Sequence, residues 1–307
     1  MNDLRLGGHL RLNNNINFER STAYMKEYTA KALSFNKYAL GESPFYDPRY
    51  NRYSWVDIIN NRLYTLKAGE KSYFTFTEPI GAAIPVEGSE NFVIAAQKGL
   101  YILNSNDEIS LYKNLTDTFK AYWRCNDAKA DDLGRIWFGA SVADDKHDAE
   151  GNLYCYKNNN FEIMQPGTKI SNGMAWNKDQ NAFYFSDSLE HAVFRYDYNK
   201  EKCVITNRIV LFPVENGVPD GMCIDADDNI WVAIWGGHRI EKRDGKTGEL
   251  LAIIHVPATN VTSCCFGPDL HTLFITTSGN DLHGEFDGCL FECIVEEKGI
   301  IANYAKI

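Results

Sequence analysis

The sequence predicts an all-β protein, a six-bladed β-propeller, and three observations carry this prediction. A strand core rich in aromatic residues recurs six times along the 307 residues, each time after a polar turn. The spacing of about 40–50 residues is the length of one four-stranded propeller blade. Long helical periodicity is absent after Tyr28, which disfavours a fold that alternates strands with helices.

The six strand cores are aligned on one aromatic residue each. These residues are Trp55, Phe92, Trp137, Tyr184, Trp231 and Phe274. The alignment gives steps of 37, 45, 47, 47 and 43 residues. A second strand is expected after each core, for example residues 61–64 in the first repeat and 192–195 in the fourth. One hairpin in every repeat is what stacked blades require.

The chain divides into a short polar extension and one large domain. Residues 1–25 contain few apolar side chains and are expected to lie outside the fold. Residues 26–307 are expected to form a single propeller. The early segment 28–35 is expected to pair with the last blade, near residues 289–297, because propellers usually close their ring with strands from both ends of the chain.

Charge and composition narrow the functional classes. The formal net charge is −10, which disfavours nucleic acid and anionic membranes as partners, because both require basic surfaces. No apolar stretch approaches the roughly 18 residues of a membrane span, and the eight cysteines include no C-x-x-C pair. We expect a cytoplasmic protein with reduced thiols, a monomer or dimer, whose partner is a small molecule.

Polar residues recur at one phase of the repeat, 11 to 13 residues before the aligned aromatic. Glu42, Asn126, Asn172 and Asp220 occupy this phase in four of the six repeats. In a propeller the innermost strand of each blade begins here, at the rim of the central channel, so the four side chains are expected to meet. Turn formation is the alternative role for any one of them. The shared phase favours a common site.

An all-oxygen set of donors with two carboxylates suits one hard divalent cation. We expect Ca²⁺, with Mg²⁺, Mn²⁺ or Zn²⁺ as alternatives. Arg124 lies two residues before Asn126 and is expected to offer its planar fork of donors to a substrate oxygen, the alternative being a surface ion pair. Asp144, in the polar stretch 141–150, is expected to bind hydroxyl groups or simply to be solvated.

The segments that carry these residues resemble those of a known family. They are Leu40-Gly41-Glu42-Ser43-Pro44, Arg124-Cys125-Asn126-Asp127-Ala128-Lys129, Ser171-Asn172-Gly173-Met174-Ala175-Trp176, Pro219-Asp220-Gly221-Met222-Cys223-Ile224-Asp225 and Thr262-Ser263-Cys264-Cys265-Phe266-Gly267. They occur in order within about residues 28–300. Together they are similar to the senescence marker protein/gluconolactonase/luciferin-regenerating enzyme family, the regucalcin-like group.

The resemblance implies a six-bladed propeller with one divalent metal ion at the channel mouth and, often, lactone hydrolysis. On the family's pattern the metal ligands fall on Glu42, Asn172 and Asp220. Asn126 falls on a position that binds substrate in some members and metal in related propellers. The resemblance also implies substrate contacts, which fall on Arg124 and Asp144.

This chain departs from the family's pattern at four positions. Ser43 and Ala128 stand where glycine is common, Cys125 stands where an aromatic residue is common, and Asp144 replaces a glutamate. The shorter side chain of Asp144 is expected to affect the choice of substrate more than the binding of the metal.

The sequence therefore predicts a metal-dependent hydrolase, a gluconolactonase-like lactonase that acts on a sugar lactone or a similar small cyclic ester. Asp220 is expected to be the general base as well as a ligand. Two alternatives stay open: phosphotriester hydrolysis on the same metal site, and a non-catalytic calcium-binding or scaffold propeller. The presence of Arg124 beside the ligands favours an enzyme, because an ion site alone does not need this arginine.

Overall fold

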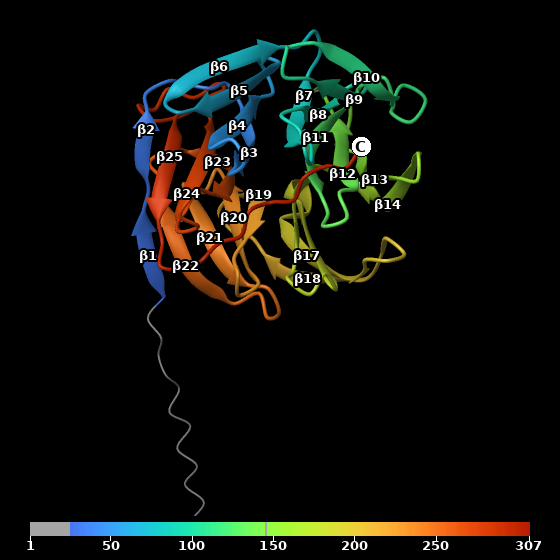
Figure 1. Ribbon diagram of the computed structural model, residues 1–307. Coiled ribbons are helices and arrows are strands. Elements are labelled where there is room, and N and C mark those ends of the chain that lie inside the picture. The colour runs from blue at the N-terminus through green and yellow to red at the C-terminus, as the bar shows by residue number, and fades with distance from the viewer. Residues whose placement is uncertain (1–24, 145) are drawn as a thin grey trace, which may run out of the picture.

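A computed structural model describes residues 25–144 and 146–307 of the chain. These residues form six sheets arranged in a ring (Figure 1). The expected six-bladed β-propeller is confirmed. The single helical element in the described ranges is a short 3₁₀ turn, η1 (Ser188–Glu190). Of the expected polar extension, residues 1–24 lie outside the described residues, and the exposed Met25 precedes the first strand.

The first three blades each consist of four consecutive antiparallel strands, with the innermost strand first. Blade one contains β3 (Gly41–Asp47), β4 (Arg52–Asp57), β5 (Arg62–Lys67) and β6 (Glu70–Thr75). Blade two contains β7 (Ile80–Pro85), β8 (Phe92–Ala96), β9 (Gly99–Leu103) and β10 (Ile109–Asn114). Blade three contains β11 (Trp123–Ala130), β12 (Ile136–Val142), β13 (Gly151–Lys157) and β14 (Asn160–Thr168).

The last three blades repeat this order, and two of them receive a strand from the start of the chain. Blade four contains β15 (Ser171–Trp176), β16 (Ala182–Asp187), β17 (Ala192–Asn199) and β18 (Val204–Pro213). Blade five contains β19 (Val218–Ile224), β20 (Asn229–Trp235), β21 (Arg239–Asp244), β22 (Leu250–His255) and β1 (Lys26–Thr29). Blade six contains β23 (Asn260–Phe266), β24 (Thr272–Ser278), β25 (Leu290–Ile294) and β2 (Lys31–Ser34).

The start of the chain closes the ring at two blades rather than one. As expected, β2 pairs with β25 of the last blade, with Lys31 opposite Glu292. The expected single strand 28–35 is nevertheless two strands, because β1 pairs in parallel with β22 of blade five. The buried Ala30 joins them, and its N–H donates to the carbonyl of His255. Figure 1 shows β1 and β2 end to end along the outer edge of these blades.

The hydrophobic core lies between neighbouring blades. Trp137 of β12, for example, packs against Trp176 and Phe183 of blade four. Inner strands are buried on both faces, and all six residues of β15 are buried. The outermost strand β18 is mostly exposed. This gradient explains why the inner strands read as continuous runs of small and apolar residues instead of alternating ones.

The alignment of the six aromatic residues was wrong in the first two repeats. Trp137, Tyr184, Trp231 and Phe274 each pack against the following blade. Trp55 and Phe92 pack against the preceding blade, Trp55 on Phe274 and Phe92 on Val56 and Leu63. Successive side chains of a strand point to opposite faces, so a shift of one residue is enough to reverse the direction.

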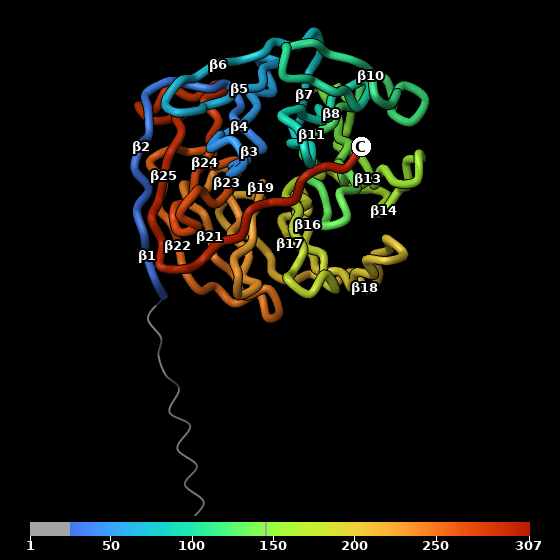
Figure 2. Tube along the Cα trace, in the orientation of Figure 1, coloured from blue at the N-terminus to red at the C-terminus, as the bar shows by residue number. Residues whose placement is uncertain are grey.

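The last residues of the chain cross one end of the central channel. Gly299 pairs with Asp225, Asn303 with Ala130 and Ala305 with Val86, so this segment joins blades five, three and two. All three partners lie at the C-terminal ends of inner strands or just beyond them. In Figure 2 the red tube of this segment runs across the middle of the ring. We call residues 299–305 the C-terminal strap.

No helix in the described ranges has the length and apolar character needed to cross a membrane. The eight cysteines are all free thiols, seven buried and one half-buried.

Candidate metal centre and active site

Every inner strand contains a β-bulge at the same level of the channel. The register with the second strand shifts between Glu42 and Phe45, Ile80 and Ala82, Cys125 and Ala128, Ser171 and Met174, Pro219 and Met222, and Val261 and Ser263. Asn126, Asn172 and Asp220 lie within their bulges, and Glu42 directly precedes its own. An extra residue in one strand re-aims the local side chains, so the expected site residues share one level for a structural reason.

Small residues after the bulged positions let the inner strands approach one another. A Cβ added at Gly173 would lie 2.5 Å from the carbonyl oxygen of Asp220, and one at Gly221 would lie 2.2 Å from the Oγ of Ser263. In blade six, Thr262 donates its hydroxyl to the carbonyl of Gly41. This bond links the last inner strand to the first.

Both carboxamides are held with their nitrogen toward the protein. The Nδ2 of Asn126 donates to the carbonyl of Ser171 at 2.9 Å, and the Nδ2 of Asn172 donates to the Oγ of Ser188 at 3.0 Å. The hydroxyl of Ser188 donates in turn to the carbonyl of Pro219, so it can only accept from Asn172. This chain of bonds fixes the amide orientation, and the buried Oδ1 of Asn172 is left without a partner.

Two carboxyl groups from blades one and five meet at this level. Glu42 and Asp220 are each 5% exposed and lie close enough for each to shift the pKa of the other. Burial and then the charge of Asp127 raise the pKa of Glu42 to about 8. Burial and the charge of Glu42 raise the pKa of Asp220 well above its usual range. Two buried carboxyls this close cannot both ionise without a compensating cation.

The donors in this site fit a divalent cation. The Oδ1 atoms of Asn172 and Asp220 are buried and accept no hydrogen bond, which is costly unless another group binds them. In residues 25–144 and 146–307, no three His, Cys, Asp or Glu side chains gather closely enough to hold a metal. A cation held here would need oxygens from other groups as well, such as the amide of Asn172. An all-oxygen set with two carboxylates suits Ca²⁺ or Mg²⁺.

Arg124 lies near the two carboxyl groups at the start of β11. Its Nη1 donates to the carbonyl of Cys125 at 3.0 Å, and no carboxylate of the described residues is within 4.0 Å of it. Burial lowers the pKa of Arg124, and the charges of Glu42 and Asp220 oppose this effect. The guanidinium thus keeps donors available for another acceptor in the channel.

Asp144 is not brought to the carboxyl pair. Its Oδ1 accepts hydrogen bonds from the backbone N–H of Lys146 and from Nδ1 of His147, both at 2.9 Å. The ring of His147 stacks on Tyr122 with a centroid distance of 3.7 Å. The bond from His147 lowers the pKa of Asp144. In this arrangement Asp144 is engaged by its own loop, and its contact with substrate stays a prediction.

Asp127 and Ser188 also belong to the site, although the sequence pattern did not predict a role for either of them. Asp127 is 2% exposed, its Oδ2 has no partner, and its charge acts on both Glu42 and Asp220. Strict alternation along a strand would turn Asp127 away from Asn126, and only the bulge puts both at this level. Ser188 follows strand β16 and holds Asn172, a contact between distant segments that sequence spacing does not reveal.

The role of Ser188 in orienting Asn172 leads to a prediction about metal affinity. Ser188→Ala is expected to weaken binding of Ca²⁺ about tenfold or more, because loss of an outer hydrogen bond to a ligand commonly has this effect. Ser188→Thr keeps the hydroxyl and should retain most of the affinity. Competition with a fluorescent chelator measures both. Ser186→Ala is the matched control, because the hydroxyl of Ser186 is buried without a partner.

The raised pKa of Glu42 predicts a pH dependence. Its ordinary value is 4.5 and its folded value is about 8, so between these pH values the folded metal-free protein holds a proton that the unfolded chain has lost. The free energy of unfolding should therefore fall as pH rises through this window. Ca²⁺ favours the ionised carboxylate, so its binding should release about one proton at neutral pH.

Thermal unfolding of the metal-free protein across this pH window, and calorimetry of Ca²⁺ binding in two buffers of different ionisation enthalpy, measure these effects. Glu42→Gln should flatten the pH dependence. A metal-free stability that rises with pH over this window would contradict the assignment.

Comparison with known proteins agrees with this architecture. Residues 40–279 match the family model described as SMP-30/Gluconolactonase/LRE-like region. The chain is 28% identical to regucalcin from Gallus gallus, over 85% of this chain and 91% of that protein. It is 29% identical to a Bacillus subtilis protein whose full name is "Putative sugar lactone lactonase YvrE", over 78% and 83% of the two chains.

Among solved structures, the chain is similar to a luciferin-regenerating enzyme, with a TM-score of 0.86 and 27% identity over 91% of this chain and 100% of that one. The family match covers all five segments that carry the candidate site residues. This protein therefore belongs to the SMP-30/gluconolactonase/LRE-like family.

Proposed function

We propose that this protein is a metal-dependent lactonase that opens a sugar lactone or a similar small cyclic ester. The observation that carries the proposal is the set of buried, unpartnered oxygens of Asn172 and Asp220 beside Glu42 and a guanidinium without a close carboxylate partner. The unpartnered oxygens could bind a cation, and the guanidinium could donate hydrogen bonds to an oxygen of the substrate. Membership of a family that includes gluconolactonases supports the same reaction.

Glu42, Asn172 and Asp220 would hold the cation, with Asn126 beside them. When bound, a divalent cation supplies a Lewis acid that polarises a carbonyl group. Arg124 would donate to an oxygen of the lactone and so fix the orientation of the ring. Asp144 would reach the substrate's hydroxyl groups only if it exchanges its bond with His147 for one of them.

Asp220 would act as the general base, and the unpartnered Oδ1 of its carboxyl group supports this role. It would take a proton from water as the water oxygen bonds to the lactone carbonyl carbon. The ring C–O bond then breaks, and the proton passes to the departing alkoxide. The product is an open-chain hydroxy acid.

A panel of sugar lactones, aliphatic lactones and phosphotriesters tests the proposal. The protein is stripped of metal and then reloaded with Ca²⁺, Mg²⁺, Mn²⁺ or Zn²⁺, and binding of each ion is titrated in parallel. Turnover of lactones with metal, lost on stripping and restored on reloading, is the expected result. Turnover of phosphotriesters alone would establish the first alternative. Tight Ca²⁺ binding without turnover of any substrate would establish a non-catalytic calcium-binding propeller.

A further inference from the structure

A second cavity lies in the channel between the bulges and the C-terminal strap. All six inner strands line it, mostly with residues beyond their bulges such as Phe45, Ile84, Met174 and Ile224, and Ile300–Asn303 of the strap line it as well. None of the candidate metal or substrate residues lines this cavity. We call it the lower cavity.

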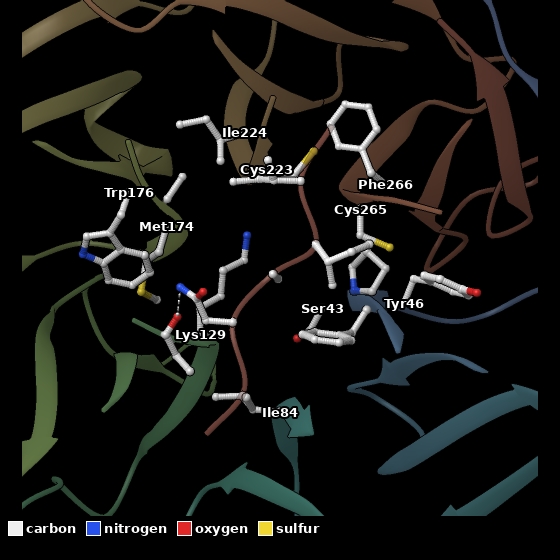
Figure 3. A pocket seen from close by; sticks show the side chains of 18 of the residues that line it. Ser43, Tyr46, Ile84, Lys129, Met174, Trp176, Cys223, Ile224, Cys265 and Phe266 are labelled. Carbon is white, nitrogen blue, oxygen red and sulfur yellow. Dashed lines mark hydrogen bonds between the residues drawn. The ribbon is translucent and has the colours of Figure 1, made fainter. Parts of the chain in front are cut away.

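Among the described residues, Lys129 is the only charged side chain that lines the lower cavity. Figure 3 shows this side chain extending toward the middle of the pocket, between Met174 and Cys223. Its Nζ donates a hydrogen bond to the carbonyl of Met222. No carboxylate in the described ranges lies within 4.0 Å of that nitrogen, whereas the cavity wall is largely apolar.

The ammonium group of Lys129 therefore has no ion-pair partner among the described residues. An ammonium has three N–H donors, and a cation among apolar side chains is costly without an anionic partner. The carboxylate whose pKa responds to Lys129 is Asp127, and that group faces Glu42 and Asp220 at the site above. An anion in the lower cavity would supply the missing charge.

The size of the cavity limits this anion. Its volume is about 90 Å³, larger than the roughly 15 Å³ of space that one water needs and smaller than the roughly 150 Å³ cavity that takes up benzene in another protein. A carboxylate with a short alkyl chain matches both the charged and the apolar parts of the cavity. Its carboxylate group can accept hydrogen bonds from Lys129, while its alkyl chain contacts Met174 and Ile224. Sugars are disfavoured, since most of their hydroxyls would find no partner here.

We propose that the lower cavity is a binding site for a short-chain carboxylate of about two to four carbons, held by Lys129. This site is independent of the lactonase proposal, because it shares no residue with the metal centre. Its head-group recognition depends on one charge and its chain recognition on the apolar wall, so a neutral alcohol of the same length should bind more weakly.

Calorimetric titration with sodium butyrate tests the site in the full-length protein. Saturable millimolar binding is expected, weakened about tenfold or more in Lys129→Met. Lys31→Met, at an exposed position on β2, is the matched control and should bind like the parent. Ala302→Leu fills the cavity from the strap without changing the charge and should also abolish binding, while 1-butanol should bind to Lys129→Met at least as well as to the parent.

Two results would overturn the proposal. One is the absence of saturable butyrate binding to the folded parent up to about 100 mM. The other is unchanged butyrate affinity in Lys129→Met or in Ala302→Leu, with folding of each variant checked by circular dichroism. Because butyrate could also reach the metal centre, the titration is repeated with Arg124→Met, which should leave the butyrate affinity unchanged if the lower cavity is the site.

Discussion

Replacing Asp220 with asparagine is expected to lower the kcat of lactone hydrolysis by about 10²–10⁴-fold, the usual effect of losing a general base. The carboxylate has two roles in the proposed site. It supplies one of the two negative charges among the proposed ligands, and an oxygen of the same carboxylate would take the proton from water. The amide can coordinate a cation but accepts no proton near neutral pH, so metal content and kcat must be measured together.

Arg124→Lys is the matched comparison for this variant. Lysine keeps the positive charge but loses the planar fork, so KM should rise with a smaller fall in kcat. If Asp220→Asn kept near-parental kcat with metal bound, Asp220 would not be the base. Asp127, which lies close enough to raise the pKa of both carboxyl ligands, would then be the next carboxylate to replace.

Removing residues 1–34 is expected to destabilise the protein by an amount comparable to its entire free energy of unfolding, on the order of 5–15 kcal/mol. The deletion removes β1 and β2 and leaves the edges of β22 and β25 unpaired. It also exposes the apolar surface that Ala30 and Tyr28 cover in the cluster between blades five and six. Unpaired edges favour aggregation, so the truncated protein should be found largely in inclusion bodies.

Removal of residues 1–24 alone is the control for this deletion, because the first described strand begins at Lys26. Thermal unfolding should give this shorter deletion the Tm of the parent. A folded protein lacking residues 1–34, with a Tm within a few degrees of the parent, would show that the ring closes without its N-terminal strands. Ala30→Asp tests the same junction without shortening the chain.

The blade architecture could be predicted from sequence because its signal is periodic. Six polar turns and six strand cores repeat at nearly constant spacing, and each hairpin is a local interaction. The direction of individual side chains could not be predicted equally well. Trp55 and Phe92 are as apolar as Trp137, and composition does not distinguish the face toward the preceding blade from the face toward the following one. The pairing of β1 with β22 of blade five could not be predicted, because β1 is not part of the sequence repeat.

For the candidate site, the sequence located the residues on inner strands and missed the groups that act on them. The shared position in the repeat was enough to predict that Glu42, Asn172 and Asp220 lie at one level of the channel, because every inner strand has its bulge at the same place. Ser188 and Asp127 could not be assigned, since a hydrogen bond between distant segments and the turn of a bulged side chain depend on three-dimensional geometry. The position of the Asp144 side chain depends on hydrogen bonds within its own loop. This loop is not part of the repeat, so the repeat pattern could not predict it.

The closure of the ring by β1 and β2 also sets an order of events during synthesis on the ribosome. Lys31 pairs with Glu292, which is near the end of the chain, so the ring cannot be complete before nearly the whole chain has been made. Pairing between parts of a chain so far apart in sequence is slow. Glu27 can pair earlier, with Ile253, as soon as blade five has emerged. Strand β1 would then hold β2 in position for the last blade, so the unfinished protein presents one open edge instead of two.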